Sequence, residues 1–192
     1  MSRIIAGSRK GHRLHTPAGD ATRPTSDRVR EAAFAMLASE LGRSGDAADQ
    51  LTGRAFLDLY AGSGAVALEA ASRGAASVVA VEQDRRAADV IRRNVRETGL
   101  GVKVVATSVE KYLAGAPARF DICWLDPPYR LANTTVQAAL ARLGEGWLAP
   151  GAIVVVERAR RGEPFAWPDR LGDSWERRYG ETTLFLATEG GG

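Results

Sequence analysis

The chain has 192 residues, of which 45% are hydrophobic and 26% are charged, with a formal net charge of +3. This length suits one α/β domain with a small extension, and the apolar content excludes general disorder. The sequence has no apolar run of the roughly 20 residues that span a membrane, no apolar stretch of a secretory signal, and a single cysteine, Cys123. We therefore expect a cytoplasmic monomer without membrane contact, disulfide or metal.

The first 30 residues are strongly basic. They contain seven Lys/Arg and two acidic residues, a net +5, whereas the other 19 basic and 21 acidic residues give −2. Residues 3–16 predict a β-hairpin around a Gly-Ser-Arg-Lys-Gly turn, and residues 27–41 predict an amphipathic helix capped by Ser26 or Asp27. The charge asymmetry favours contact with a polyanion, although a solvated basic arm explains the charge equally well.

Strands and helices alternate from residue 54 onward. Continuous apolar runs predict strands at 54–60, 77–82, 103–107, 120–126 and 151–157, with helices at 63–74, 84–99, 108–116 and 135–144. Such runs are typical of a parallel sheet covered on both faces, and the alternation predicts a doubly wound α/β fold. Residues 174–180 and 182–188 predict a closing antiparallel hairpin. We expect an extension at 1–25, a main domain at 26–189 and a flexible tail at 190–192.

A glycine-rich turn follows the first strand of this section. Gly62, Gly64 and Ala67 fit the Gly-x-Gly-x-x-Gly/Ala spacing, which allows a tight turn and close approach of a ligand to the backbone. Glu82 ends the next strand about 20 residues later, where a carboxylate accepts hydrogen bonds from ribose hydroxyls. The pattern fits a dinucleotide as well as S-adenosylmethionine, and a glycine-rich turn without a ligand is the simpler alternative.

The stretch Leu-Asp-Pro-Pro-Tyr-Arg ends the fourth strand. Two prolines fix two φ angles and remove two backbone donors, so the loop presents Asp126 and Tyr129 rigidly. An exocyclic amine of a nucleobase is a poor nucleophile, because its lone pair is delocalised into the ring. Asp126 and the Pro127 carbonyl can accept its N–H groups while Tyr129 stacks on the base, which gives near-attack positioning and electrostatic stabilisation. The alternative is an ordinary Asp-Pro turn at a strand end.

These residues also carry a family resemblance. Asp-Pro-Pro-Tyr resembles the Asp/Asn/Ser-Pro-Pro-aromatic motif of S-adenosylmethionine-dependent methyltransferases that act on planar amino groups. The segments RIIAGSRKGHRL, RPTSDRVREAAFAML, FLDLYAGSGAVALEAASRGA and RYGETTLFL are similar to successive segments of one bacterial family. That family methylates guanine N2 in 16S ribosomal RNA, at the guanine numbered 966. The match runs nearly end to end, and RPTSDRVRE is its most specific part.

The resemblance implies a Rossmann-like methyltransferase with a mostly parallel seven-stranded sheet, a C-terminal antiparallel hairpin and a small N-terminal β-hairpin that grips 16S ribosomal RNA or the 30S subunit. It implies S-adenosylmethionine as cofactor, bound by Asp58, Tyr60, Gly62, Ser63, Gly64, Glu82, Gln83, Ser108 and Val109, with Ser108 and Val109 beside the adenine. The implied catalytic loop is Asp126, Pro127, Pro128 and Tyr129. The implied RNA contacts are Arg3, Lys10, Arg13, Arg23, Thr25, Arg28 and Arg30.

Three other functions remain open at this point. A DNA amino-methyltransferase shares the Asp-Pro-Pro-Tyr chemistry, but the chain has no room for the sizeable target-recognition region of such enzymes. An NAD-dependent oxidoreductase explains the glycines and Glu82 but not the Asp-Pro-Pro-Tyr loop or the basic arm. A non-catalytic RNA-binding module with a Rossmann core is the third, and the intact Asp126 and glycine turn argue against it.

Overall fold

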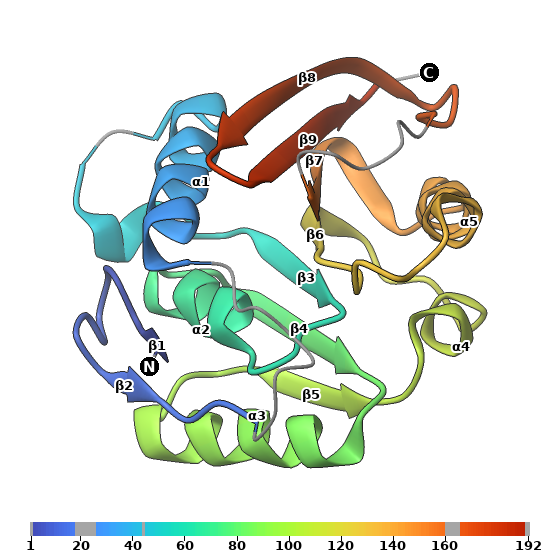
Figure 1. The fold of residues 1–192 in the computed structure, drawn as a ribbon. Helices are drawn as coiled ribbons and strands as arrows, with labels where there is room; N and C mark the ends of the chain where they lie inside the picture. Colours follow the sequence, from blue (N-terminus) through green and yellow to red (C-terminus); the bar gives the residue numbers. More distant parts are fainter. Residues whose placement is uncertain (1, 18–25, 44, 160–165, 191–192) are drawn as a thin grey trace.

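The computed structural model describes residues 2–17, 26–43, 45–159 and 166–190. In this part of the chain a central sheet contains seven strands in the order β5-β4-β3-β6-β7-β9-β8 (Figure 1). Five parallel strands are β3 (Ala55–Leu59), β4 (Ser77–Glu82), β5 (Lys103–Ala106), β6 (Phe120–Leu125) and β7 (Leu148–Ala159). The antiparallel strands are β8 (Leu171–Tyr179) and β9 (Thr182–Glu189). The expected fold class is confirmed.

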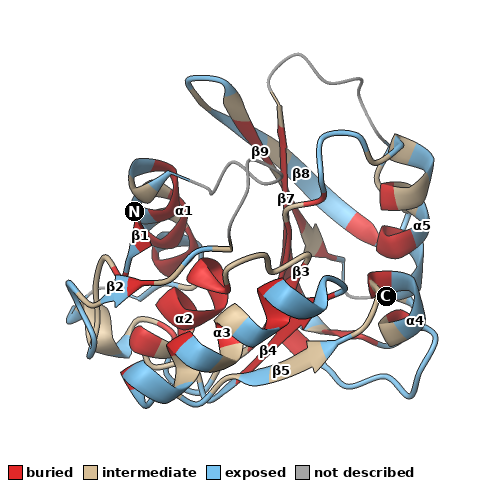
Figure 2. Ribbon diagram, turned by 60° about the horizontal axis from the view of Figure 1, so that its bottom comes forward, coloured by how far each residue is buried: buried red, intermediate tan, exposed pale blue. Residues whose placement is uncertain are grey.

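Helices cover both faces of the sheet. One face carries α1 (Asp27–Glu40), α2 (Ala65–Ser72) and α3 (Arg85–Thr98), and the other carries α4 (Val109–Leu113) and α5 (Asn133–Gly144) (Figure 1). Successive side chains of a strand point to opposite faces, so Phe56 and Trp124 pack with the first group and Leu57 and Leu125 with the second. Both faces are therefore apolar, which explains the continuous hydrophobic runs; Figure 2 shows the buried residues along these strands.

Several element boundaries differ from those predicted. β7 begins at Leu148 and β8 at Leu171, each three residues earlier than expected, because pairing with neighbouring strands extends them past their apolar cores. In the N-terminal hairpin only β1 (Ser2–Arg3) and β2 (Arg13–Leu14) pair. A short 3₁₀ helix, Ala47–Asp49, lies between α1 and β3. The cap of α1 agrees with prediction: the Ser26 hydroxyl accepts the N–H of Val29 at 3.3 Å.

The N-terminal hairpin is fixed to helix α2. The Glu69 carboxylate accepts the backbone N–H groups of Ile5 at 2.7 Å and Ala6 at 3.0 Å, and Ser8 N donates to Ser72 O at 2.8 Å. Gly7 has φ +83°, and a Cβ there would lie 1.9 Å from Ser72 O, so glycine is required for this close approach. The hairpin and the main domain therefore form one surface.

The strand order reverses beside β3. The chain runs outward from β3 to β4 and β5, then returns to place β6 on the other side of β3. In open α/β sheets ligands bind at the carboxyl ends of the strands near such a switch point. The register pairs Leu59 of β3 with Leu125 of β6, so the glycine turn and the Asp-Pro-Pro-Tyr loop leave the sheet side by side.

Candidate active site

The turn after β3 folds sharply back toward helix α3. Tyr60 has φ 64°, the single non-glycine residue with positive φ in the part of the chain that the structure describes. This conformation is strained for an aromatic residue, and such strain clusters at functional sites. Gly64 has φ +75°, and a Cβ there would lie 2.7 Å from Ile91 Cγ2, so the turn packs tightly on α3. The Gly62 Cβ position is open, with no atom within 4 Å, so a ligand can approach its backbone.

The Glu82 side chain is hydrogen-bonded directly to this turn. Its Oε2 accepts the N–H of Gly62 at 2.8 Å, and its Oε1 accepts the N–H of Asp84 at 2.8 Å. Asp84 is also the residue whose side chain caps α3. Each carboxylate oxygen keeps a further lone pair, so Glu82 can also accept ribose hydroxyls. Gln83 is exposed beside it.

Asp58 is in β3, just before the turn, and is almost fully buried. Its Oδ2 accepts the N–H of Ala67 in the first turn of α2 at 3.0 Å. Burial raises the pKa of this carboxyl to about 8, with a smaller contribution from the charges of Glu82 and Glu157. Asp58 therefore joins strand β3 to helix α2 rather than presenting its carboxylate at the surface.

Ser108 and Val109 follow strand β5 at the same edge of the sheet. The Ser108 hydroxyl caps α4 by accepting the N–H of Lys111 at 3.3 Å, and Val109 is buried in the core under α4 and α5. The structure thus gives both residues a structural function, and their place beside an adenine stays a prediction.

The Asp-Pro-Pro-Tyr loop lies next to the glycine turn. Asp126 N donates to Leu59 O at 3.4 Å, at the point where β6 ends. Pro127 is buried, while Pro128 and Tyr129 are exposed, with Tyr129 exposing 54% of its surface. Leu131 N donates to Pro128 O at 2.8 Å, which closes a turn after the prolines. The loop is therefore held at both ends and presents its aromatic ring to solvent.

Sequence reasoning missed two residues at this site. Arg158, near the end of β7, is buried, and its Nη2 donates to Leu131 O at 3.1 Å and to Asn133 Oδ1 at 2.8 Å. Asn94 of α3 donates to Ser63 O at 3.2 Å and also exchanges two hydrogen bonds with the His15 backbone, so it joins the glycine turn to the N-terminal extension. A polar residue in an otherwise apolar position is the signal that marks both in the sequence.

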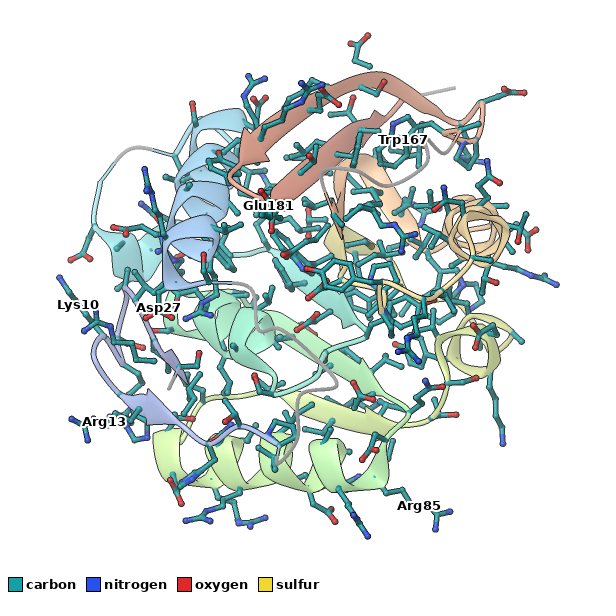
Figure 3. All side chains as sticks on the ribbon, viewed as in Figure 1. Lys10, Arg13, Asp27, Arg85, Trp167 and Glu181 are labelled. Atoms are coloured by element: carbon teal, nitrogen blue, oxygen red, sulfur yellow. The ribbon has the colours of Figure 1, made fainter. Side chains whose placement is uncertain are left out.

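The predicted RNA contacts divide into three groups, the last of which is Arg30 alone. Arg3, Lys10, Arg13 and Arg28 are exposed, and Figure 3 shows Lys10 and Arg13 pointing away from the domain. Arg23 and Thr25 lie outside the described residues.

Arg30 differs from the expectation. Its side chain is fully buried, and its Nη2 donates to Arg3 O at 2.5 Å and Asp27 Oδ1 at 2.9 Å. Its Nε lies 3.9 Å from Glu69 Oε2. Arg30 therefore joins α1 to the hairpin and to α2, and the surface contact predicted for it is wrong because its charge is directed inward.

The described residues provide neither a metal centre nor a helix that could span a membrane. Residues 2–17, 26–43, 45–159 and 166–190 contain no group of three or more His, Cys, Asp or Glu that could hold a metal ion. In the same residues, none of the helices has the length and apolar character needed to cross a bilayer.

The chain is similar to known proteins along nearly its whole length. The model of a family described as "Conserved hypothetical protein 95" matches residues 2–188. A relative from Escherichia coli K12, "Ribosomal RNA small subunit methyltransferase D", is 35% identical over 156 residues, covering 81% of this chain and 73% of the relative.

Two solved structures extend the comparison. "Putative methyltransferase yhhF" from Escherichia coli has a TM-score of 0.81 at 30% identity and covers 98% of this chain and 97% of its own. A Thermus thermophilus "16S rRNA N2 G1207 methyltransferase" in complex with AdoMet and guanosine has a TM-score of 0.64 at 25% identity, covering 90% of this chain and 44% of its own.

Proposed function

The chain belongs to the family described as Conserved hypothetical protein 95, and on that premise we propose that it methylates N2 of guanine 966 in 16S ribosomal RNA, with the 30S subunit as substrate. Its relatives identify it as an S-adenosylmethionine-dependent methyltransferase of ribosomal RNA. What we propose beyond this is the methylated atom, N2, the nucleotide, guanine 966, and the substrate particle, the 30S subunit. It also describes a monomer that acts in the cytoplasm, where ribosomal subunits are assembled.

One observation carries the choice of chemistry. The register of Leu59 with Leu125 places the start of the glycine turn beside Asp126, and the Asp126 N–H donates to Leu59 O. A group held at the glycine turn and a base held at Asp126 therefore meet at one edge of the sheet. The Thermus thermophilus neighbour in complex with guanosine is a 16S rRNA N2 methyltransferase, which supports the same atom here.

The residues of the turn fit S-adenosylmethionine. The open Cβ position of Gly62 leaves its backbone accessible, and Glu82 offers carboxylate lone pairs for ribose hydroxyls beside it. Ser63 and Gly64 would line the methionine part, and Gln83 lies next to the ribose position. When bound, S-adenosylmethionine supplies an electrophilic methyl group on its sulfonium.

Asp126, Pro127 and Tyr129 act on the base. The Asp126 carboxylate and the Pro127 carbonyl accept the two N–H groups of guanine N2, which orients the nitrogen lone pair. The exposed Tyr129 ring stacks on the base, and a guanine that is flipped or unpaired reaches this position. The Asp126 charge stabilises the positive charge that develops on N2, and the methylated nitrogen then loses its proton without a strong base.

The exposed basic residues supply the RNA contact. Lys10 and Arg13 of the hairpin and Arg28 of α1 carry positive charge on a surface that Glu69 and Arg30 hold rigid. Phosphate contacts of this kind position an RNA without reading its sequence. Specificity for one guanine then depends on the shape of the ribosomal substrate.

The first experiment is transfer of labelled methyl from S-adenosylmethionine to unmodified 30S subunits, naked 16S RNA and duplex DNA. Label in N2 of guanine 966, with more transfer to 30S subunits than to naked RNA, is the expected result. Label only in DNA would favour the DNA amino-methyltransferase. Cofactor binding without transfer to any acceptor would favour the non-catalytic RNA-binding module.

A further inference from the structure

Arg158 places a buried guanidinium beside the catalytic loop. The sheet register pairs Leu125 of β6 with Val156 of β7, so Arg158 lies two residues beyond that pair, next to the Asp126–Tyr129 stretch. The side chain is only 8% exposed, although arginine is rarely buried without a specific partner. Its position at the carboxyl edge of the sheet points to the active site.

The guanidinium holds the far end of the loop. One nitrogen, Nη2, donates both to Leu131 O at 3.1 Å and to Asn133 Oδ1 at 2.8 Å. Asn133 is the first residue of α5, and the preceding residue, Ala132, provides no side-chain cap for that helix. The contacts of Arg158 therefore fix the junction between loop and helix that the local sequence leaves without a cap.

Arg158 also contributes charge. Burial lowers its pKa, whereas the neighbouring Asp126 and Tyr60 raise it, so the guanidinium lies within the field of the Asp126 carboxyl. An arginine stays protonated in proteins even when buried. Its second terminal nitrogen, Nη1, is buried and has no hydrogen-bond partner in the structure. A buried donor without an acceptor carries a desolvation cost, which an acceptor entering the site would offset.

Other titratable groups surround this pair. Tyr60 directly follows β3, and the charge of Glu110 of α4 contributes to raising the pKa of its hydroxyl. The charges of Glu157 of β7 and Glu82 of β4 both contribute to raising the pKa of the buried Asp58. These groups are acidic or neutral. Arg130, one residue after Tyr129, is a cation of the same loop but is exposed, whereas Arg158 is a buried cation.

We propose that Arg158 is a positioning residue for methyl transfer: it locks the loop through Leu131 and Asn133 and keeps the Asp126 carboxylate charged and oriented toward the amine. The inference rests on the proposed function, since it assigns Asp126 the task of accepting the amine N–H groups. A guanidinium that only stabilised the packing of β7 against α5 would leave the titration of Asp126 unchanged.

Two variants separate these cases. Arg158→Met keeps the volume of the side chain and removes its charge, and Arg158→Lys keeps the charge but loses the planar fork that reaches two acceptors. The matched control is Arg170→Met, because the Arg170 side chain is 63% exposed and pairs with Glu189 far along the chain from the loop. Thermal unfolding and S-adenosylmethionine affinity are measured for each variant first.

The decisive measurements are the ¹³Cγ NMR titration of Asp126, assigned with Asp126→Asn, and the pH profile of kcat on unmodified 30S subunits. In Arg158→Met we expect the Asp126 midpoint and the acid limb of kcat to move up by about 1 pH unit or more. We also expect kcat to fall about tenfold or more while KM changes little. Arg158→Lys should keep the Asp126 titration midpoint but show a lower kcat.

The outcomes also distinguish the two proposals. An unchanged Asp126 midpoint in Arg158→Met would overturn the inference, and so would a wild-type kcat in Arg158→Lys if Arg158→Met fails to fold. The NMR titration needs no RNA. A shifted midpoint in an enzyme that transfers no methyl to 30S subunits would therefore support the electrostatic pairing and contradict the proposed function.

Discussion

The Gly62 N–H donates to Glu82 Oε2 at 2.8 Å, so the glycine turn after β3 and the acid at the end of β4 form one hydrogen-bonded unit. The second oxygen accepts the Asp84 N–H, which ties the same carboxylate to the start of α3. Three segments of the fold thus meet at a single side chain. The cofactor site that we propose is therefore organised around this carboxylate.

Glu82→Gln should weaken S-adenosylmethionine binding. An amide has one acceptor oxygen, so it cannot accept both backbone N–H groups and the ribose hydroxyls. We expect Kd to rise about tenfold, a loss of about 1.4 kcal/mol, by titration calorimetry. Asp89→Asn is the control, because the Asp89 side chain is 73% exposed on α3. An unchanged Kd would remove Glu82 from the cofactor site.

Asp126→Ala should separate binding from chemistry. Its carboxylate is assigned to the amine rather than to the cofactor, so the S-adenosylmethionine Kd should stay within about twofold while kcat falls about 100-fold or more. Calorimetry and labelled methyl transfer measure the two quantities. Asp173→Ala on the exposed face of β8 is the control. Equal losses in both assays would count against a catalytic role.

Lys10→Ala combined with Arg13→Ala should weaken RNA binding in a salt-dependent way. Both side chains are exposed on the hairpin, and each phosphate contact releases counterions. The slope of log K against log salt should fall by about 1.5 for two contacts. Arg142→Ala on α5, exposed and paired with Glu145, is the control. A wild-type slope in the double variant would place the hairpin outside the interface.

Arg30→Ala should destabilise the fold instead. Removing this guanidinium leaves the buried Glu69 carboxylate with less compensation and breaks the link from α1 to the hairpin. We expect a loss of about 3 kcal/mol in the free energy of unfolding, measured with urea. Arg3→Ala, whose side chain is 67% exposed, should change stability by less than about 0.5 kcal/mol. Similar values for the two variants would contradict the buried role.

Asp58→Asn should change the pH dependence of stability. The folded-state pKa of Asp58 is raised from 3.8 to about 8, so between these values the folded chain binds a proton that the unfolded chain has released. Stability of the wild type should therefore fall as pH rises through this range, by at most about 1.4 kcal/mol per unit from this group. Urea unfolding at several pH values should show no such contribution in Asp58→Asn. If the unfolding free energies of the wild type and Asp58→Asn change with pH in parallel, the raised pKa of Asp58 is contradicted.

The glycine turn, Glu82 and the Asp-Pro-Pro-Tyr loop could all be identified before the fold was known. Each depends on residues close together in the chain: glycines where φ is positive, prolines that stiffen a loop, an acid at a strand end. The alternation of apolar runs also determines which strand ends share an edge, because a parallel sheet places all carboxyl ends together. Local chemistry and strand order were sufficient to propose this part of the candidate site and to bring its segments together.

The tertiary structure alone decided the state of the buried charges. Arg30 lies three, four and seven residues before Ala33, Phe34 and Leu37, on the apolar face of α1, yet its basic neighbourhood suggested a surface contact. Its partners outside α1 come from the hairpin and α2, and those of Arg158 come from the loop after β6 and the start of α5. A charge is stable in a core only where distant segments supply its acceptors. The chain's sequence specifies the charged residues, and the packing of those segments determines which face solvent and which hold the site together.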